Sequence, residues 1–531
     1  MILPARTHRP LIMGRNGAVG SNHPMATQAG LDVLRAGGNA VDAAVAVSLA
    51  LGVCEPSSSG LGGDGFYHVY IAAGGRADVF NGTGTAPRAA TPDAYAGGIP
   101  VLGPRSVSVP GLLGGVAAMH AAHGTRPWAS LVAPAVALAR DGFAATFHFV
   151  RGSRENHDRL AADKCSAAVF LGKSIGDLVL QPDLARTLEE IAADGPDAFY
   201  RGRLATRLVR GMAEAGTLIT QADLAACVAD ASLPIAISYR GWEVRQTPPN
   251  STGFTLLQML KIVEQFDLHA ASPAERVHLL VEAKKRAFLD RERYGADPRF
   301  EAVPLDLLLS DAHAARHAAA IERGRAAVID QPAAAFGGDT TYFAVVDAAG
   351  NAVSAIQSIN SGYGSGVTAG DTGILLNNRM AYWHLAPGHA NRLVPGKRVR
   401  HTMNAPMVFR DGKLALVLGT PGADNQVQVN LQVLVAMLDF GADPQTALEA
   451  PRWTSSQAGQ GANWPHSGDG RLTIEADFPA DVLADLERRG HALHRVGHLE
   501  GPCAMQAIQV LDNGVRAAGS DPRRDGWASA Y

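Results

Sequence analysis

A chain of 531 residues is long enough for two or three domains of average size, although a large α/β unit can also fold as one. With 47% hydrophobic and 18% charged residues, the composition indicates a globular protein with a large core and excludes a disordered chain. The formal net charge of −3 and the absence of a Lys/Arg-rich run argue against nucleic acid or an anionic membrane as a partner, so we expect a small-molecule substrate.

Neither the cysteines nor the histidines form a metal-binding motif. The four cysteines are widely spaced without a C-x-x-C pair, which argues against a zinc knuckle or a thiol redox site, and a chain of this length does not need disulfides. No ligand-spaced cluster stands out among the 18 histidines. We therefore expect free, buried thiols, no metal and no cofactor.

The N-terminal residues 1–10 contain no apolar stretch that is long enough for a secretory signal peptide. The longest apolar run, residues 43–53, is too short for a bilayer span, which needs about 20 residues. We expect a cytoplasmic protein without a membrane segment; the periplasm is the less favoured location.

Two helices are predicted near the N-terminus. The first begins at Pro24 and ends before the glycines at 37–38. The second has Asn39 as its N-cap, with Asp42 in capping-box spacing, and it is apolar nearly all round, which is typical of a helix buried on several sides. A strand is predicted over residues 66–71.

Residues 110–330 show mostly helical patterns. The clearest helix start is Ser272, an N-cap that is followed by a proline and by Glu275 at the third helical position, and this helix runs to about residue 293. The small-residue segment 331–340 is predicted to be a surface loop.

The pattern changes after residue 340. Residues 341–346 and 352–359 are predicted to be paired strands joined by a glycine-containing turn, and residues 427–440 a helix. Further strand-like runs are residues 407–409, 414–418 and 507–511. Helices packed on sheets, without regular βαβ alternation, indicate an α+β fold.

The usual hydrolase signatures are missing: a Gly-x-Ser-x-Gly elbow, a His-Glu-x-x-His zinc site and a phosphate-binding loop. That leaves Thr340, at the start of a predicted strand, as the candidate nucleophile.

Residues 339–347 and 350–354 are similar to the start of the small subunit in the γ-glutamyltransferase family, and the resemblance covers nearly the whole chain. The other motifs that carry it are residues 37–44, 55–56, 60–66, 85–87, 108–111, 138–142, 248–249, 297–298, 358–360, 364–366, 373–378, 419–422 and 521–524.

The resemblance implies an N-terminal-nucleophile hydrolase with an αββα sandwich, in which two stacked antiparallel sheets are flanked by helices. Cleavage between Asp339 and Thr340 would leave a helix-rich large subunit, residues 1–339, that covers one side of the site, and a small catalytic subunit, residues 340–531. The two subunits from one precursor would stay together noncovalently, and such heterodimers can further form a homodimer.

The catalytic group that the resemblance implies is Thr340. A threonine hydroxyl is a poor nucleophile until a base takes its proton, and in this family the base is the threonine's own α-amino group, which cleavage frees. An α-amine has a reference pKa of about 7.7–8.0, which suits a general base near neutral pH, and it is tethered close to the hydroxyl. The intermediate is an acyl-Thr340 ester, and water or an amine then accepts the acyl group.

Four further positions match the family's catalytic machinery. Ser358 stands where the family has a second threonine beside the nucleophile, and Asn360 matches a position that holds the amine or the substrate. Gly422 and Ala423 match a Gly-Gly pair whose backbone N–H groups form the oxyanion hole. Because alanine keeps its N–H group, we expect the hole to survive.

The substrate pocket departs from the γ-glutamyl pattern. Thr83 takes the place of the arginine that clamps the α-carboxylate, a loss of about 2–5 kcal/mol for a buried charged pair. Arg379 and Tyr382 replace the Gln and Asp that hold the amino group, while His401 and Thr402 replace a Ser-Ser pair. These changes favour an acyl group with an anionic or polar end and no free α-amine.

Two substrate classes therefore stay open. The string from Arg400 to Asn404, with Asn378 and Arg379, looks more like the oxamate amidohydrolase and acylase-like branches, and there Arg379 becomes the carboxylate clamp. The sequence favours a γ-glutamyl amide and some other amide equally as the substrate. With an altered pocket, hydrolysis is favoured over transfer.

Two rival hypotheses belong to other classes. One is an uncut, non-catalytic member that binds a small ligand; the retained Thr340, Asn360 and Gly422 argue against it. The other is a metal or nucleotide enzyme built on the glycine-rich residues 60–65. This run does not follow a strand, open a helix or contain Gly-Lys-Ser/Thr, so a tight structural turn beside the site is the better interpretation.

Overall fold

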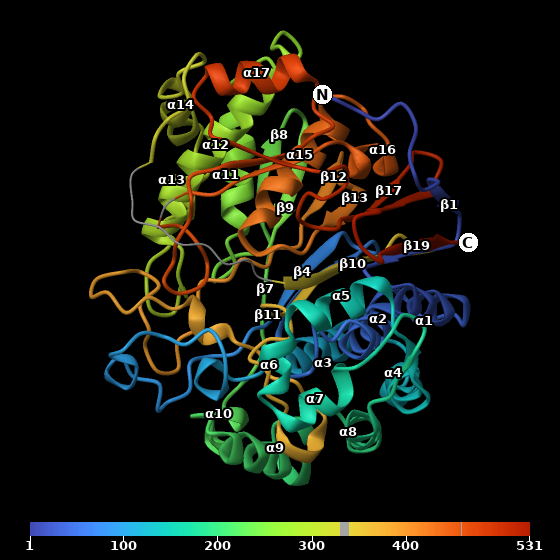
Figure 1. The fold of residues 1–531 in the computed structure, drawn as a ribbon. Coiled ribbons are helices and arrows are strands. Elements are labelled where there is room, and N and C mark those ends of the chain that lie inside the picture. The colour runs from blue at the N-terminus through green and yellow to red at the C-terminus, as the bar shows by residue number, and fades with distance from the viewer. Residues whose placement is uncertain (330–338, 458) are drawn as a thin grey trace.

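Two seven-stranded antiparallel sheets form the centre of the computed structural model, within its described residues 1–329, 339–457 and 459–531 (Figure 1). The first sheet has, in spatial order, β1 (Ile12–Gly14), β18 (Arg516–Ser520), β17 (Gln506–Val510), β13 (Lys413–Gly419), β12 (Met407–Arg410), β9 (Trp242–Gln246) and β8 (Ile235–Tyr239). The second has β19 (Trp527–Ala530), β2 (Gly17–Ser21), β10 (Asp339–Asp347), β11 (Ala352–Asn360), β3 (Asp64–Ile71), β4 (Arg76–Gly82) and β7 (Asp230–Ser232). Each sheet contains strands from both sides of residue 340.

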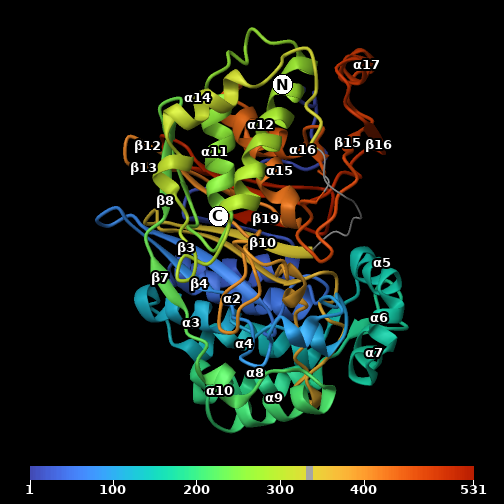
Figure 2. The same ribbon diagram turned by 90° about the vertical axis from the view of Figure 1, so that its left-hand side faces the viewer.

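The two sheets stack face to face with an apolar layer between them. Along β10, Tyr342 and Ala344 point into this layer, whereas Phe343 and Val345 point to the outer face, as the two-residue period of a strand requires. Because helices cover the outer face too, the strand is apolar on both sides. Figure 2 shows the order of the layers: α2 to α9 below the strands, and α11, α12 and α15 above them.

Helices from two parts of the chain form the outer layers. Those on the second sheet's side are α1 (Pro24–Arg35), α2 (Ala40–Cys54), α3 (Leu112–His123), α4 (Trp128–Asp141), α5 (Phe147–Glu155), α6 (His157–Ala161), α7 (Lys164–Phe170), α8 (Pro182–Asp194), α9 (Gly202–Ala215) and α10 (Gln221–Ala225). Those on the first sheet's side are α11 (Gly253–Val263), α12 (Pro273–Tyr294), α13 (Leu305–Leu308), α14 (Asp311–Ala319), α15 (Gln426–Leu438), α16 (Pro444–Glu449) and α17 (Ala480–Arg488). The layers confirm the predicted αββα sandwich.

The capping residues that predicted the starts of helices make the expected hydrogen bonds. Asn39 accepts hydrogen bonds from the N–H groups of residues 41 and 42, and Asp42 accepts one from the Asn39 N–H, which completes the capping box of α2. Every residue of α2 except Gly52 is buried, as its all-round apolar sequence predicted. Ser272 caps α12 by accepting from the Glu275 N–H.

The structure differs from the prediction in the helical middle of the chain. There, β8 and β9 form an edge hairpin of the first sheet that the sequence pattern did not predict. These strands are five residues each and partly exposed, so their pattern is short beside the long helices around them. The predicted surface loop lies outside the described residues over 331–338, and residues 339 and 340 already belong to β10.

Two smaller sheets accompany the large ones. One consists of β14 (Trp453–Ser455), β15 (Leu472–Glu475) and β16 (Leu493–Val496), and in the other β5 (Phe143–Ala144) pairs with β6 (Leu178–Val179). All four cysteines are free thiols, as predicted, but only Cys54 and Cys503 are buried as expected; Cys165 is exposed and Cys227 is half-buried. Among the described residues, no helix has the length and apolar character needed to cross a membrane.

Candidate active site

Thr340 is the second residue of β10, a central strand of the second sheet, and only 3% of it is exposed. Asp339 pairs with Asn360 and Thr341 pairs with Gln357, so the register shifts by one residue between them. Two residues of β11, at 358 and 359, therefore lie opposite Thr340. A bulge of this kind re-aims side chains and is often found beside active sites.

The bulge brings Ser358 to the hydroxyl of Thr340. The Thr340 Oγ1 donates a hydrogen bond of 3.2 Å to Ser358 Oγ, and the backbone N–H of Asn360 donates one of 2.8 Å to the same oxygen. Asn360 has a φ of +84°, a conformation that asparagine tolerates better than most residues. Ser358 thus lies beside the predicted nucleophile, where the family resemblance placed it.

Asn360 connects the threonine to the predicted substrate pocket. Its Nδ2 donates to the Asn378 carbonyl at 3.2 Å and to Asn463 Oδ1 at 2.8 Å, while its Oδ1 accepts from Arg379 Nη1 at 3.4 Å. The amide group is therefore held on both sides.

Arg379 is buried, with 1% exposure, in the short 3₁₀ turn Arg379–Tyr382. Its guanidinium carbon lies 4.5 Å from the centre of the Tyr382 ring, and its Nε lies 3.4 Å from Asp64 Oδ2. Its Nη2 makes no hydrogen bond within the part of the chain that the structure describes. A buried donor of a charged group without a partner is costly and marks a place where a ligand can supply the acceptor.

Asp64 belongs to the same buried cluster, although the sequence pattern did not single it out. Its Oδ1 accepts from the Gly84 N–H at 2.7 Å, and its Oδ2 lies 3.5 Å from His401 Nε2. Burial alone would raise the pKa of this carboxyl, but the contacts of His401, Arg379 and the Gly84 N–H outweigh burial and hold the pKa below its usual value. An ionised aspartate therefore faces Arg379.

His401 and Thr402 lie beside Tyr382 in the same buried cluster. His401 is fully buried, and burial together with the charge of Arg379 lowers its pKa to about 4, so its ring is neutral at pH 7. The hydroxyl groups of Tyr382 and Thr402 are hydrogen-bonded at 3.1 Å. Burial raises the pKa of Tyr382, so it is a neutral phenol. Of these five pocket residues, Arg379 and Asp64 are thus the two that carry a charge.

Thr83 joins the site only indirectly. Its hydroxyl donates to Asn81 Oδ1 at 2.7 Å and accepts from Asn250 Nδ2 at 3.3 Å. These two bonds use its donor and one acceptor position, and the neighbouring Gly84 makes the contact with Asp64. Thr83 is therefore connected to Asp64 only through the backbone of its neighbour Gly84.

The turn after β13 holds the predicted oxyanion residues. Gly419, at the end of β13, packs so closely on the ring of Tyr342 in β10 that a Cβ there would lie 2.3 Å from the ring, so the turn begins beside the strand that carries Thr340. Gly422 and Ala423 have φ angles of +121° and +49°. Their role as oxyanion donors stays a prediction, because it concerns a bound acyl group.

Two antiparallel sheets between helical layers, with a buried threonine at the start of a central strand, define an N-terminal-nucleophile hydrolase. The family model described as Gamma-glutamyltranspeptidase matches residues 26–531. The chain belongs to the γ-glutamyltranspeptidase family and is an enzyme of its self-processing amidase and acylase type.

Similar proteins cover almost the full chain. The glutathione hydrolase-like YwrD proenzyme of Bacillus subtilis (strain 168) is 39% identical over 97% of this chain and 99% of its own. The acylase ACY 1 proenzyme of Pseudomonas sp. (strain SE83) is 38% identical over 97% and 93%. The crystal structure of cephalosporin acylase from Bacillus halodurans superposes with a TM-score of 0.91 at 34% identity, over 99% of this chain and 98% of that one. The fold that the sequence resemblance implied is confirmed.

Proposed function

We propose that the precursor cuts itself between Asp339 and Thr340 and that the new N-terminal threonine hydrolyses an amide. In the first step, Thr340 Oγ attacks the amide carbonyl while its own α-amine takes the hydroxyl proton and passes it to the leaving amine. Water then cleaves the acyl ester and restores the hydroxyl. The observation that carries this proposal is the buried Thr340 Oγ1, hydrogen-bonded to Ser358 and linked through Asn360 to Arg379.

The products of self-cleavage would be residues 1–339 and 340–531. The word proenzyme in the names of both relatives supports a precursor that is cut. Intact mass spectrometry of purified protein tests this directly: the parent should give two chains, and Thr340→Ala should give one. A parent that is fully active as one continuous chain would contradict the proposal.

The acyl group we propose ends in a carboxylate that binds Arg379. Guanidinium groups hold carboxylates with two parallel hydrogen bonds, and the Nη2 of Arg379 is buried without a hydrogen bond of its own among the described residues. Asp64 already accepts from Gly84 and faces Arg379 and His401. Because His401 is neutral and Arg379 is cationic, a substrate ammonium beside Arg379 would be repelled.

A second candidate is the γ-glutamyl amide itself. The ion pair of Asp64 and Arg379, 3.4 Å apart, places opposite charges side by side, which matches the amino and carboxylate groups of an α-amino acid. In that case Asp64 would exchange part of its contact with Arg379 for the substrate ammonium. The two candidates differ in one functional group of the substrate.

One pair of substrates separates the candidates. Glutaryl-p-nitroanilide and γ-glutamyl-p-nitroanilide have the same acyl chain, and only the second carries an α-amine. We expect kcat/KM to be at least tenfold higher for the glutaryl compound, a difference of about 1.4 kcal/mol in transition-state binding. Faster turnover of the γ-glutamyl compound would favour the second candidate.

The variant Arg379→Met tests the clamp. It removes the charge but keeps a long side chain, so kcat/KM for the carboxylate-ended substrate should fall at least thirtyfold, from the loss of about 2–5 kcal/mol for a buried charged contact. The double variant Asp64→Asn/Arg379→Met is the matched control, because it leaves no unpaired buried charge. Both should still cleave at Thr340. Unchanged kcat/KM would rule out Arg379 as the clamp.

A further inference from the structure

Among the described residues, histidine and carboxylate side chains meet at three places along α12, each in contact with a different part of the chain. The three groups are His278, Glu282 and His491; Asp290, His313 and His317; and Glu292, His384 and His389. Each group contains at least one residue of α12, and none of them contains a residue of the candidate active site. The three groups differ in how their polar atoms are hydrogen-bonded.

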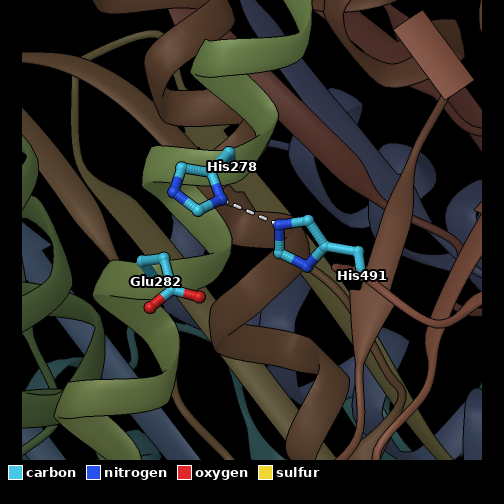
Figure 3. Close-up of side chains that lie close together, drawn as sticks. All are labelled: His278, Glu282 and His491. Carbon is cyan, nitrogen blue, oxygen red and sulfur yellow. Dashed lines mark hydrogen bonds between the residues drawn. The ribbon is translucent and has the colours of Figure 1, made fainter. Parts of the chain in front are cut away.

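In the first group, hydrogen bonds and ion pairs already satisfy the three side chains, and one of these hydrogen bonds joins the two histidines (Figure 3). His278 Nε2 lies 2.8 Å from the carbonyl of Glu322 and so carries its proton there, which leaves Nδ1 to accept from His491 Nε2 at 2.9 Å. Glu282 is paired with Lys285 at 2.8 Å and with Arg286 at 2.7 Å. Each group already has a complementary partner, so this cluster needs no ion.

The third group is a stack of rings. His384 is parallel to His389 at 3.6 Å between centres, with 7° between the planes, and to His466 at 3.5 Å with 8°. The lone pairs of an imidazole lie in the ring plane, so those of stacked rings run parallel and do not meet at one ion. Glu292 is bound by Arg291 and by Arg400. This geometry also excludes a shared metal.

The second group has converging lone pairs. Asp290 Oδ2 lies 2.7 Å from His313 Nε2 and 3.0 Å from His317 Nε2, and the two nitrogens are 2.9 Å apart. The histidines are one helical turn apart on α14, so they project side by side, and Asp290 reaches them from α12. The three atoms form a triangle with edges of hydrogen-bond length.

Protons alone do not satisfy such a triangle. Each Nε2 has one in-plane position, which holds either a proton or a lone pair. If both nitrogens donate to Asp290, their two N–H groups face each other across 2.9 Å. If one nitrogen is unprotonated, its lone pair faces the carboxylate oxygen instead. In every arrangement with an ionised Asp290, one edge of the triangle places two donors or two acceptors against each other, whereas a cation inside the triangle accepts all three lone pairs.

We propose that Asp290, His313 and His317 bind a divalent transition-metal ion, zinc by preference, and thereby join α14 to α12. Two imidazole nitrogens and a carboxylate oxygen are a donor set that suits zinc. Around a tetrahedral zinc with bonds of about 2.0–2.1 Å, neighbouring donors are about 3.3 Å apart. Each of the three atoms therefore needs to move by only a few tenths of an ångström.

Neighbouring groups fit this proposal. Gln258 of α11 contacts Asp290 Oδ2 through its Nε2, and its buried Oε1 has no hydrogen-bond partner among the described residues. A half-turn of this amide presents an oxygen as a fourth ligand. The His317 side chain is 18% exposed, which gives an ion a route from solvent.

One neighbouring side chain, Arg316, opposes metal binding. It donates to His313 Nδ1, which favours a proton on the Nε2 that the ion needs. Arg316 is exposed on α14, so its side chain can turn into solvent and leave Nδ1 free to carry the proton. We therefore expect Arg316→Ala to bind zinc more tightly than the parent.

Zinc titration of purified, chelator-treated protein by isothermal calorimetry tests the site. We expect one equivalent of zinc per chain and a rise in Tm on binding, with affinity at least a hundredfold weaker in His317→Gln and in the nearly isosteric Asp290→Asn. His491→Gln, in the first group (Figure 3), is the matched control and should bind zinc as tightly as the parent. Lack of stoichiometric binding by the parent, or parent-like affinity in both ligand variants, would overturn the proposal.

Discussion

Ser358 is the residue on which the geometry of the nucleophile depends most directly. Its hydroxyl oxygen accepts from Thr340 Oγ1 and from the Asn360 N–H, both in a fully buried setting. In Ser358→Ala these donors lose a buried partner, which costs about 1–3 kcal/mol. We expect a roughly tenfold to hundredfold slower self-cleavage and kcat, with KM little changed.

The conservative change Ser358→Thr supplies the control. It restores the hydroxyl and returns to the residue that the family resemblance implies, so activity should recover to near the parent level. Time courses of precursor cleavage and steady-state kinetics give the two rates. Equal rates for Ser358→Ala and the parent would show that this hydroxyl has no part in the reaction.

Sequence patterns led to most of the pocket but not to all of it. Thr340, Ser358 and Asn360 lie within one hairpin, so motif matching along the chain was enough to bring them together. The sequence did not reveal Asp64, because its place in the site depends on contacts with residues 379 and 401, which are distant in sequence. A glycine-rich run is typical of a turn, and only the fold shows that its acid is buried beside an arginine.

Among the elements, the turn between β13 and α15 is the most constrained part of the site. Gly422 has a φ of +121°, and a Cβ there would lie 2.4 Å from the sulfur of Cys503. Ala423 has a φ of +49°, in the left-handed region that costs a non-glycine residue about 1–2 kcal/mol. The two neighbouring positions should therefore respond to substitution in opposite ways.

We expect Ala423→Gly to keep kcat within about twofold and to raise stability, because it removes the left-handed strain and keeps the N–H group. Gly422→Ala should lose most activity, because it is strained and overlaps Cys503. Thermal unfolding and kcat of the two variants, measured side by side, check this. An inactive Ala423→Gly would speak against a backbone oxyanion hole in this turn.

Helix boundaries were predictable where capping groups mark them, as at Asn39 and Ser272. Strand partners were predictable only within the β10–β11 hairpin, because its turn is short. The β8–β9 hairpin was missed, and its place at the edge of the first sheet depends on Met407 to Phe409 of β12, far along the chain. Long-range pairing has no local signature that one sequence shows.

For the whole molecule, the sheets determine how firmly the two proposed subunits are held together. β10 and β11 lie between β2 and β3, and in the first sheet β12 pairs with β9. Each proposed subunit therefore supplies strands to both sheets, and their separation would break backbone ladders and the apolar layer. We expect the two chains to co-elute in native size exclusion and to separate only in denaturant. Separation under native conditions would contradict this.

Acid should unfold the molecule through its buried histidines. Burial lowers the pKa of His23, His68 and His401 from 6.5 to about 4 each. Between these values the unfolded chain binds more protons than the folded one, so stability falls as pH drops from about 6.5 to 4, by up to about 1.4 kcal/mol per pH unit for each histidine. His68→Asn removes one such group while its amide can still donate to the Ala405 carbonyl, and it should flatten the slope. Urea unfolding at several pH values measures both slopes; a parent whose stability is constant over this range would show that these rings are not held neutral.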